Sequence, residues 1–479
     1  MFFAVSVLLK LILWWSAPPG AAYDDHFAPI FKIAATLSLP EKTDCWQCYQ
    51  PPLFYAVSAA AGRVAFAAGL RREAGFKKFL QLFPCLYGML TLWISYRILL
   101  LLPVSGPAGA AAFGFLAFCP RLTYLSAMHT NDTFAALAAA LTLWAFLRAR
   151  GRGFSWRSQA LLSATVILAV FSKPTALFAP GAVFVGIAAA YFIARSIPRG
   201  RALAAAALCC LLPGALLGLS LLANEARYGY PLPDNMRLFH VTFTPRPGHG
   251  GVDFLSFRPF SALRSPIVDD STVSSPPTVA AAHLWYDTEG WFQIAATQGN
   301  RPLHDWWIQH YAALTDIRMP WPKGPPPLPP SELLLARALI FLGFFPLILV
   351  LAGLLDCAAG LFRRIEEFNG TRGEKTAARD KSVGLLTAAA FAGGALVVMA
   401  AYTAYYATFL GMRTHYLLPG LPGLTALAAF GWDALSRLLR PAPRPLRLAA
   451  RILAWLLAFS LYFLAALHII RLSLLLASA

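Results

Sequence analysis

Long apolar runs recur along this chain of 479 residues, and they set the strongest limit on its fold. A helix needs about 20 predominantly apolar residues to cross the hydrocarbon core of a bilayer, and about 11 runs approach that length. Backbone N–H and C=O groups find no water in that core, so each run must bond internally as a helix. Hydrophobic residues make up 58% of the sequence, too many for an ordinary soluble protein. The sequence therefore predicts an all-α polytopic membrane protein.

The expected spans fall into two groups on either side of a long polar stretch. The first group covers residues 1–20, 79–102, 107–126, 130–147, 159–172, 175–194 and 202–222, and the second covers 333–355, 383–402, 415–435 and 452–470. Three parts follow from this pattern: a membrane module at 1–222 with a first external loop at 21–78, a large external loop at 223–330, and C-terminal membrane helices at 331–479. Residues 1–20 lack a basic start and Lys10 interrupts them, which favours an uncleaved first span over a signal peptide.

The net charge of +18 comes from Lys and Arg residues that cluster in short loops. Such loops lie on the cytoplasmic side of membrane proteins, so the charge indicates orientation and gives no reason to expect a nucleic-acid partner. The most basic short loops are 148–157, 195–201 and 437–451. Placing all three in the cytoplasm puts the loop at 223–330 outside, and with it the first loop, on the expected outer face of a bacterial inner membrane.

The apolar run Leu53–Leu70 is the one segment that this orientation does not allow to cross the membrane. Arg63 lies near its centre, and Arg71, Arg72, Lys77 and Lys78 follow it. If the run crossed, the first polar loop would lie on the opposite side from the loop at 223–330. We therefore expect a helix at the membrane surface. This places the four cations that follow it on the outer side, against the usual preference of basic residues for the cytoplasmic side.

The first external loop carries the most unusual polar residues of the chain. Asp24, Asp25 and His26 follow the first span, and Gln50 precedes Pro51-Pro52-Leu53. Ionisable residues beside a bilayer are costly, so they are functional candidates by default. Asp24–Leu39 is expected to form a short helix along the membrane surface, with an Asp capping its start.

An acidic pair followed by His-Phe, and later by an X-Pro-Pro-Leu run, resembles the first external loop of glycosyltransferase family 39. This family belongs to the GT-C superfamily and includes protein O-mannosyltransferases and bacterial lipid A aminoarabinose transferases. Its usual pattern is Asp-Glu, a spacer, His or Arg, an aromatic residue, and later His-Pro-Pro-Leu. Here Asp25 stands for the Glu, the spacer is missing and Gln50 replaces the His, so which acid is catalytic stays open. The resemblance implies a GT-C fold with two juxtamembrane helices in this loop.

Other candidates reach the same outer face from distant parts of the sequence. Asp132, in His129-Thr-Asn-Asp-Thr133, has two readings: part of a helix N-cap, or the second acidic site that the resemblance implies. Lys173 precedes Pro174-Thr175, a turn that the family often has, and could bind a phosphate or simply reach the interface. Arg413, His415 and Tyr416 lie in a run that also resembles the family, and a guanidinium can hold a phosphate through two hydrogen bonds.

These residues suggest a chemistry for a membrane face that has no pool of nucleotide sugars. The donor would be a sugar on a polyprenyl phosphate, and the acceptor a lipid, glycan or protein. Asp24 or Asp25 would take the acceptor proton, Lys173, Arg413 and His415 would stabilise the departing phosphate, and Gln50 and Asp132 would orient the groups. The resemblance implies inversion at the anomeric carbon. No cofactor is called for, although a divalent metal stays possible. A transporter of lipid-linked sugars is the alternative function.

Two of the seven cysteines, Cys45 and Cys48, lie in the polar first loop. In an oxidising compartment they would form a local disulfide before Gln50. A metal-binding pair or two free thiols are the alternatives. The other five cysteines lie in or beside apolar segments, where they are expected to pack as small buried hydrophobic residues.

Overall fold

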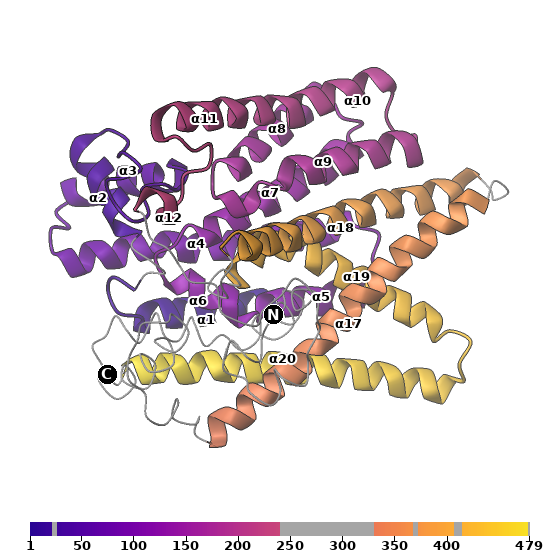
Figure 1. Ribbon diagram of the computed structural model, residues 1–479. Coiled ribbons are helices and arrows are strands. Elements are labelled where there is room, and N and C mark those ends of the chain that lie inside the picture. Colours follow the sequence, from indigo (N-terminus) through magenta and orange to yellow (C-terminus); the bar gives the residue numbers. More distant parts are fainter. Residues whose placement is uncertain (22–25, 240–329, 367–371, 407–413, 478–479) are drawn as a thin grey trace.

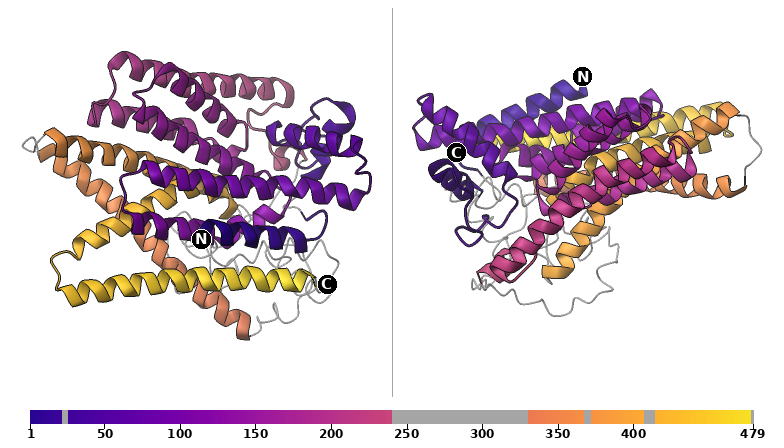
Figure 2. Two further views of the ribbon diagram at one scale, coloured as in Figure 1. Left: turned by 180° about the vertical axis from the view of Figure 1, so that it is seen from behind. Right: turned by 90° about the horizontal axis from the view of Figure 1, so that it is seen from above.

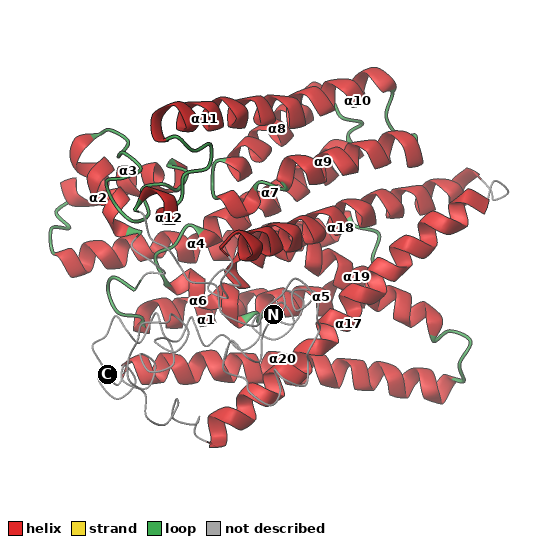
Figure 3. Ribbon diagram, in the orientation of Figure 1, coloured by secondary structure: helices red, strands yellow, loops and turns green. Residues whose placement is uncertain are grey.

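The computed structural model describes residues 1–21, 26–239, 330–366, 372–406 and 414–477. Throughout these ranges the regular structure is helical and no β-strand is present (Figure 3). The predicted all-α class is therefore confirmed. Most of the loop predicted at 223–330 lies outside the described residues, as do Asp24, Asp25 and Arg413.

The N-terminal half of the chain contains most of the described helices. They are α1 (Phe2–Ser16), α2 (Phe27–Thr36), α3 (Leu53–Ala67), α4 (Glu73–Leu101), α5 (Gly106–Ala117), α6 (Pro120–Ala127), α7 (Asp132–Gly151), α8 (Trp156–Val170), η1 (Pro174–Ala176), α9 (Ala179–Ala188), η2 (Ala189–Ile193), α10 (Arg199–Ala206), η3 (Ala207–Leu211), α11 (Leu212–Tyr228) and α12 (Asn235–Leu238). The C-terminal part adds α17 (Pro330–Glu366), α18 (Arg372–Tyr406), η5 (Thr414–Gly420), α19 (Leu421–Leu438) and α20 (Arg444–Ala477).

Among the described residues, seven helical segments are long and apolar enough to cross a membrane, and eight if the bent pair α5–α6 forms one span. The pair bends by 45° at Cys119 and Pro120, because a proline cannot supply the N–H that would continue the helix. The predicted spans at 1–20 and 159–172 correspond to α1 and α8, each with 15 residues, which is short of a full crossing. The count of about 11 spans stays a prediction.

The helices pack side by side, and the short pair α2 and α3 lies at one end of the bundle (Figures 1 and 2). The C-terminal end of α20 lies at the same end in all three views. The run predicted not to cross the membrane forms α3, whose 15 residues pack against α2 and the start of α4. Arg63 of α3 donates a hydrogen bond to the carbonyl of Ala34, 2.6 Å away, which ties the pair together.

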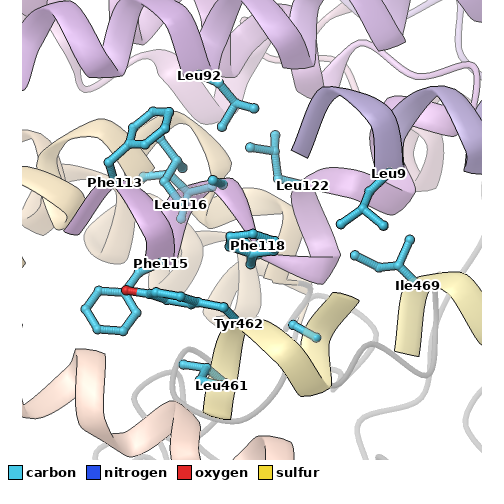
Figure 4. Close-up of a cluster of buried hydrophobic side chains, with 14 of the residues drawn as sticks. Leu9, Leu92, Phe113, Phe115, Leu116, Phe118, Leu122, Leu461, Tyr462 and Ile469 are labelled. Atoms are coloured by element: carbon cyan, nitrogen blue, oxygen red, sulfur yellow. The ribbon is translucent and has the colours of Figure 1, made fainter. Parts of the chain in front are cut away.

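One close interface joins two of the C-terminal helices to each other, and a second one joins α20 to α5 in the N-terminal half. Gly353 of α17 and Gly431 of α19 face each other's helix so closely that a Cβ on either would collide with a backbone carbonyl. Inside a bilayer, no hydrophobic force drives helices together, so close van der Waals packing does so instead. Small residues such as these glycines allow that packing. Around α5 and α20, Figure 4 shows Tyr462 lying against Phe115 and Phe118. The Tyr462 hydroxyl donates to the carbonyl of Ala111, 2.7 Å away, so its one polar group is satisfied.

Candidate active site

The junction between α6 and α7 anchors the loop that follows α1 to the buried part of the bundle. The backbone N–H of His129 donates to the carbonyl of Ala21 over 2.8 Å, and the side-chain amide of Gln81 donates to the same carbonyl over 3.0 Å. The chain leaves the described residues after Ala21 and returns at His26, which is also buried. Asp24 and Asp25 fall between these two anchored residues, outside the described part of the chain.

A buried ion pair lies at this junction. The Lys173 ammonium is 2.7 Å from Asp132 Oδ1, and the Thr130 hydroxyl donates to Asp132 Oδ2 over 2.7 Å. The side chains of Asp132 and Lys173 are 0% and 7% exposed, so both charges have lost most of their water. An ammonium has three N–H donors, and the described residues accept from one of them. The pair can therefore bind a further acceptor without being broken.

Asp132 and Lys173 each lie where one helix ends and the next begins. Asp132 occupies the first turn of α7, directly after the irregular segment that ends α6. Lys173 has an extended backbone between α8 and the short helix η1, and Pro174 at the start of η1 disfavours a helical conformation for it. Two helix interruptions thus place a carboxylate and an ammonium against each other across 41 positions of the sequence.

Gln50 connects the first loop to the start of α7. Its carbonyl oxygen accepts from the Asn131 amide over 3.4 Å, and its own amide donates to Gln47 over 3.2 Å and to the Tyr49 hydroxyl over 2.9 Å. Asn131 occupies the N-cap position of α7, as the cap reading of this segment predicted, but its side chain makes no capping bond. Its amide group donates to Gln50 instead.

Several polar atoms around the ion pair keep free hydrogen-bonding capacity. Asn131 Oδ1, Thr133 Oγ1 and Thr175 Oγ1 are buried and have no partner within the described ranges. Buried polar groups in proteins are almost always satisfied, so such a cluster indicates a place where a polar ligand or water binds. All three belong to segments that already hold Asp132 or Lys173.

His26 lies beside this cluster in an aromatic environment. Its Nδ1 is 2.8 Å from the Tyr55 hydroxyl, and the two rings stack. Burial, and after it the positive charge of Lys173, holds the pKa of His26 well below its usual 6.5. His129 stacks on Phe27 at 4.5 Å between ring centroids, and burial lowers its pKa to about 3. Both imidazoles are therefore neutral near pH 7.

The helix predicted over Asp24–Leu39 begins later than expected. It is α2, which starts at Phe27 with His26 at the N-cap position and no side-chain capping bond. The N-cap position is therefore held by a histidine and not by an acid. Asp24 and Asp25 lie outside the described residues.

The C-terminal candidates reach the junction through one short helix. The 3₁₀ helix η5 packs against α7 and against η1, the elements that carry Asp132 and follow Lys173. Tyr416 on η5 is half-buried. Arg413 lies outside the described residues, and the side chain of His415 is not described either. The structure thus brings His26, Gln50, Asp132 and Lys173 together and places the segment of Tyr416 beside them.

Sequence reasoning missed several residues of this site. Tyr55, Gln47 and Thr130 hold candidates in place, and only contacts across the fold reveal them. Arg121, near the start of α6, is 0% exposed, and a charged residue inside an apolar run is the signal that could have found it. The described part of the chain contains no group of three or more His, Cys, Asp or Glu side chains that could hold a metal ion.

Comparison with known proteins gives a structural match but no sequence match. No family model matches the chain, and no curated protein does. The apo oligosaccharyltransferase of Archaeoglobus fulgidus is similar over 98% of this chain, with 14% identity and a TM-score of 0.50. The fold is of the GT-C type. This confirms the fold expected from the family resemblance.

The match covers only part of the archaeal protein, since the chain spans about 55% of its length. AglB from Archaeoglobus fulgidus, in complex with an inhibitory peptide and a dolichol-phosphate, has a TM-score of 0.48 at 14% identity over 98% of this chain and 56% of that one. ArnT from Cupriavidus metallidurans, bound to undecaprenyl phosphate, has a TM-score of 0.36 at 15% identity over 91% of this chain and 77% of that one. At these two TM-scores, neither structure is used to assign the fold.

Proposed function

We propose that the chain is an integral membrane glycosyltransferase that moves a sugar from a polyprenyl-phosphate donor to an acceptor on the outer face of the membrane. The observation that carries the proposal is the buried polar network at the α6–α7 junction. Gln50, Asp132 and Lys173 come from three separate segments, and each was a candidate from its sequence context alone. The GT-C fold, shared with an oligosaccharyltransferase, supports the same class of function.

The first chemical step needs a base beside the acceptor. We assign this role to Asp24 or Asp25, because each is an acid and His26 follows them in the site. The carboxylate takes the proton of the acceptor hydroxyl while the oxygen attacks the anomeric carbon. The bond from that carbon to the phosphate oxygen breaks, and its electron pair leaves with the polyprenyl phosphate. Attack opposite the leaving group inverts the configuration.

The leaving phosphate needs positive charge that is fixed before the reaction. Lys173 supplies it, because Asp132 holds the ammonium in place and leaves it further N–H donors. Asp132 is thus a positioning residue, and so is Gln50 through Asn131. We place Arg413, His415 and Tyr416 on the phosphate side, since η5 packs beside η1.

The three parts of the chain take different roles in this proposal. Residues 1–222 carry the catalytic groups, residues 223–330 shape the acceptor and donor sites, and residues 331–479 complete the groove for the lipid. The protein would lie in the inner membrane of a bacterium, with the site facing outward. A sugar moved by this mechanism needs no cofactor beyond its lipid carrier.

The test replaces the acids one at a time and together. In purified protein in nanodiscs, Asp24→Asn, Asp25→Asn and the double variant are compared for release of polyprenyl phosphate from undecaprenyl-phosphate mannose and undecaprenyl-phosphate aminoarabinose, with a membrane lipid extract as acceptor. Loss of a general base should lower the rate by roughly 10²–10⁴, with thermal stability near that of the wild type. Asp44→Asn is the matched control, because Asp44 is an exposed acid of the same loop paired with Lys32.

Near-normal transfer in the double variant would show that neither acid is the base. Wild-type protein that moves the lipid-linked sugar across a vesicle membrane without releasing polyprenyl phosphate would support a transporter instead.

A further inference from the structure

A cavity of about 840 Å³ lies at the end of the bundle opposite the candidate active site. Ser105 and Pro107 form one wall at the start of α5, whereas α6, the second half of the same bent segment, ends at the site. The last turns of α19 and the first turns of α20 form the other walls. Figure 1 shows the loop joining α19 to α20 far from α2 and α3. The cavity is therefore separate from the proposed catalytic site.

The polar groups of the cavity leave an excess of positive charge. Asp433 is engaged at the start of α5, where its carboxylate accepts from the Ser105 backbone over 2.9 Å and from the Ser105 hydroxyl over 2.5 Å. Arg437 is paired with Asp356 at 2.7 Å. Arg440 and Arg451 also line the cavity, are exposed, and have no ion-pair partner in the described parts of the chain. Two guanidinium groups thus remain free at the mouth.

The floor of the cavity is aromatic and apolar. The rings of Trp432 and Trp455 are 5.1 Å apart, and those of Trp455 and Phe459 are 5.3 Å apart. Ile452 and Leu456 line the same space and are 51% and 59% exposed, which suits a surface that faces lipid. A ligand that fills this cavity must combine an anionic group with an apolar body.

We propose that the cavity is a binding site for an anionic phospholipid. The phosphate lies between Arg440 and Arg451, and the upper part of an acyl chain lies along Trp455 and Phe459. Basic pockets between membrane helices on the cytoplasmic side are suited to such head groups, and the segment 437–451 carries five arginines. The volume falls in the range of specific ligand pockets. The site is independent of the proposed transferase activity.

The test compares lipids on the delipidated protein in detergent. Native mass spectrometry measures retention of phosphatidylglycerol and phosphatidylcholine, and a thermal melt measures stabilisation by each. Wild-type protein should retain phosphatidylglycerol preferentially. Arg440→Gln with Arg451→Gln should weaken that preference roughly 30-fold, because each basic residue near an anionic lipid strengthens binding by a factor of about five. Both side chains are exposed, so the variant should fold.

A matched control separates a site from general attraction. Arg444→Gln with Arg447→Gln removes the same charge from the same end of α20 but touches no lining residue of the cavity. It should leave phosphatidylglycerol retention within about twofold, a change typical of distant surface charges. An equal loss in both variants would overturn the proposal in favour of diffuse attraction. Equal retention of both lipids by the wild type, or equal stabilisation by inorganic phosphate alone, would overturn it as well.

Discussion

Asp132 and Asp356 are two acids that bind cations at opposite ends of the bundle. Asp132 has one cation, Lys173, and its side chain is fully buried. Asp356 of α17 has two, Lys381 of α18 and Arg437 of α19, each 2.7 Å away, and its side chain is 11% exposed. Both cations of Asp356 are partly exposed, at 27% and 36%. The two clusters use the same chemistry in different surroundings.

The difference between the two ends indicates different tasks. At Asp356, one carboxylate joins three helices, and both of its cations are partly exposed. At Asp132, the pair is desolvated, and buried oxygens of Asn131, Thr133 and Thr175 lie nearby without partners in the described residues. A cluster that only links helices is expected to have all of its buried hydrogen-bonding groups satisfied within the protein. The Asp356 cluster is therefore a structural ion-pair cluster that links helices, and the Asp132 cluster has the properties of a binding site.

The largest expected effect distinguishes these two acids directly. Asp132→Asn leaves a buried ammonium without its counter-charge, which costs about 3–5 kcal/mol of unfolding free energy. It should also lower sugar transfer by at least about 10², because the charge that stabilises the leaving phosphate is displaced. Asp356→Asn should cost about 2 kcal/mol, the scale of a hydrogen bond to a charged group, and leave transfer unchanged. Denaturant unfolding and the release of polyprenyl phosphate measure the two effects.

Removing both charges at the active-site end tests whether the pair is only structural. Asp132→Asn combined with Lys173→Met leaves no unpaired charge, so stability should return to within about 1–2 kcal/mol of the wild type. Transfer should stay as low as in the single variant. A double variant that regained both stability and transfer would show that the pair serves only to hold η1 against α7.

A smaller effect should appear in the pH dependence of stability, because neutral imidazoles are buried at the active-site end. The pKa of His129 is about 3 in the folded protein and about 6.5 when unfolded. The unfolded state therefore binds more protons between these values, so stability is complete above about pH 6.5 and falls as the pH drops. At pH 5 the loss from His129 is about 2 kcal/mol. His129→Phe should flatten the melting temperature between pH 5 and 7, and an unchanged slope would contradict this.

Much of the fold could be predicted because a membrane leaves few alternatives to a helix. The apolar runs located α4, α7, α17, α18 and α20. The orientation set by the basic loops, together with Arg63, led to the prediction that the run of α3 does not cross. The bend at Cys119 and Pro120 was not predicted. A proline inside an apolar run can begin a new helix or kink a continuous one, and the sequence does not distinguish the two.

The candidate site was predictable as a set of residues but not as an arrangement. Gln50, Asp132 and Lys173 were each identified because they are polar residues beside apolar runs and lie in motifs that resemble the family. That Lys173 pairs with Asp132 depends on packing between α7 and η1, which no local pattern encodes. Asn131 shows the same limit: a local rule correctly placed it at the N-cap position, but not its amide bond to Gln50, 81 positions away.

The smallest expected effect concerns the turn that presents Gln50 at the active-site end. Cys45 and Cys48 form a disulfide in the structure, with their Cα atoms 5.1 Å apart. Backbone bonds from Cys48 N to Cys45 O and from Gln50 N to Gln47 O, at 3.0 and 3.2 Å, already close the turn. So short a loop loses little entropy on closure, and Cys45→Ser with Cys48→Ser should cost at most about 2 kcal/mol. Transfer should fall less than threefold, since Gln50 also keeps its bond to Asn131; about 0.6 kcal/mol corresponds to that factor.

Intact-mass analysis tests the pairing itself. Alkylation of the denatured protein without reductant should modify the five other cysteines, 85, 119, 209, 210 and 357, and reduction should raise the count to all seven. Seven modified thiols without reductant would show that Cys45 and Cys48 are free. The turn before Gln50 would then be closed by its backbone hydrogen bonds alone.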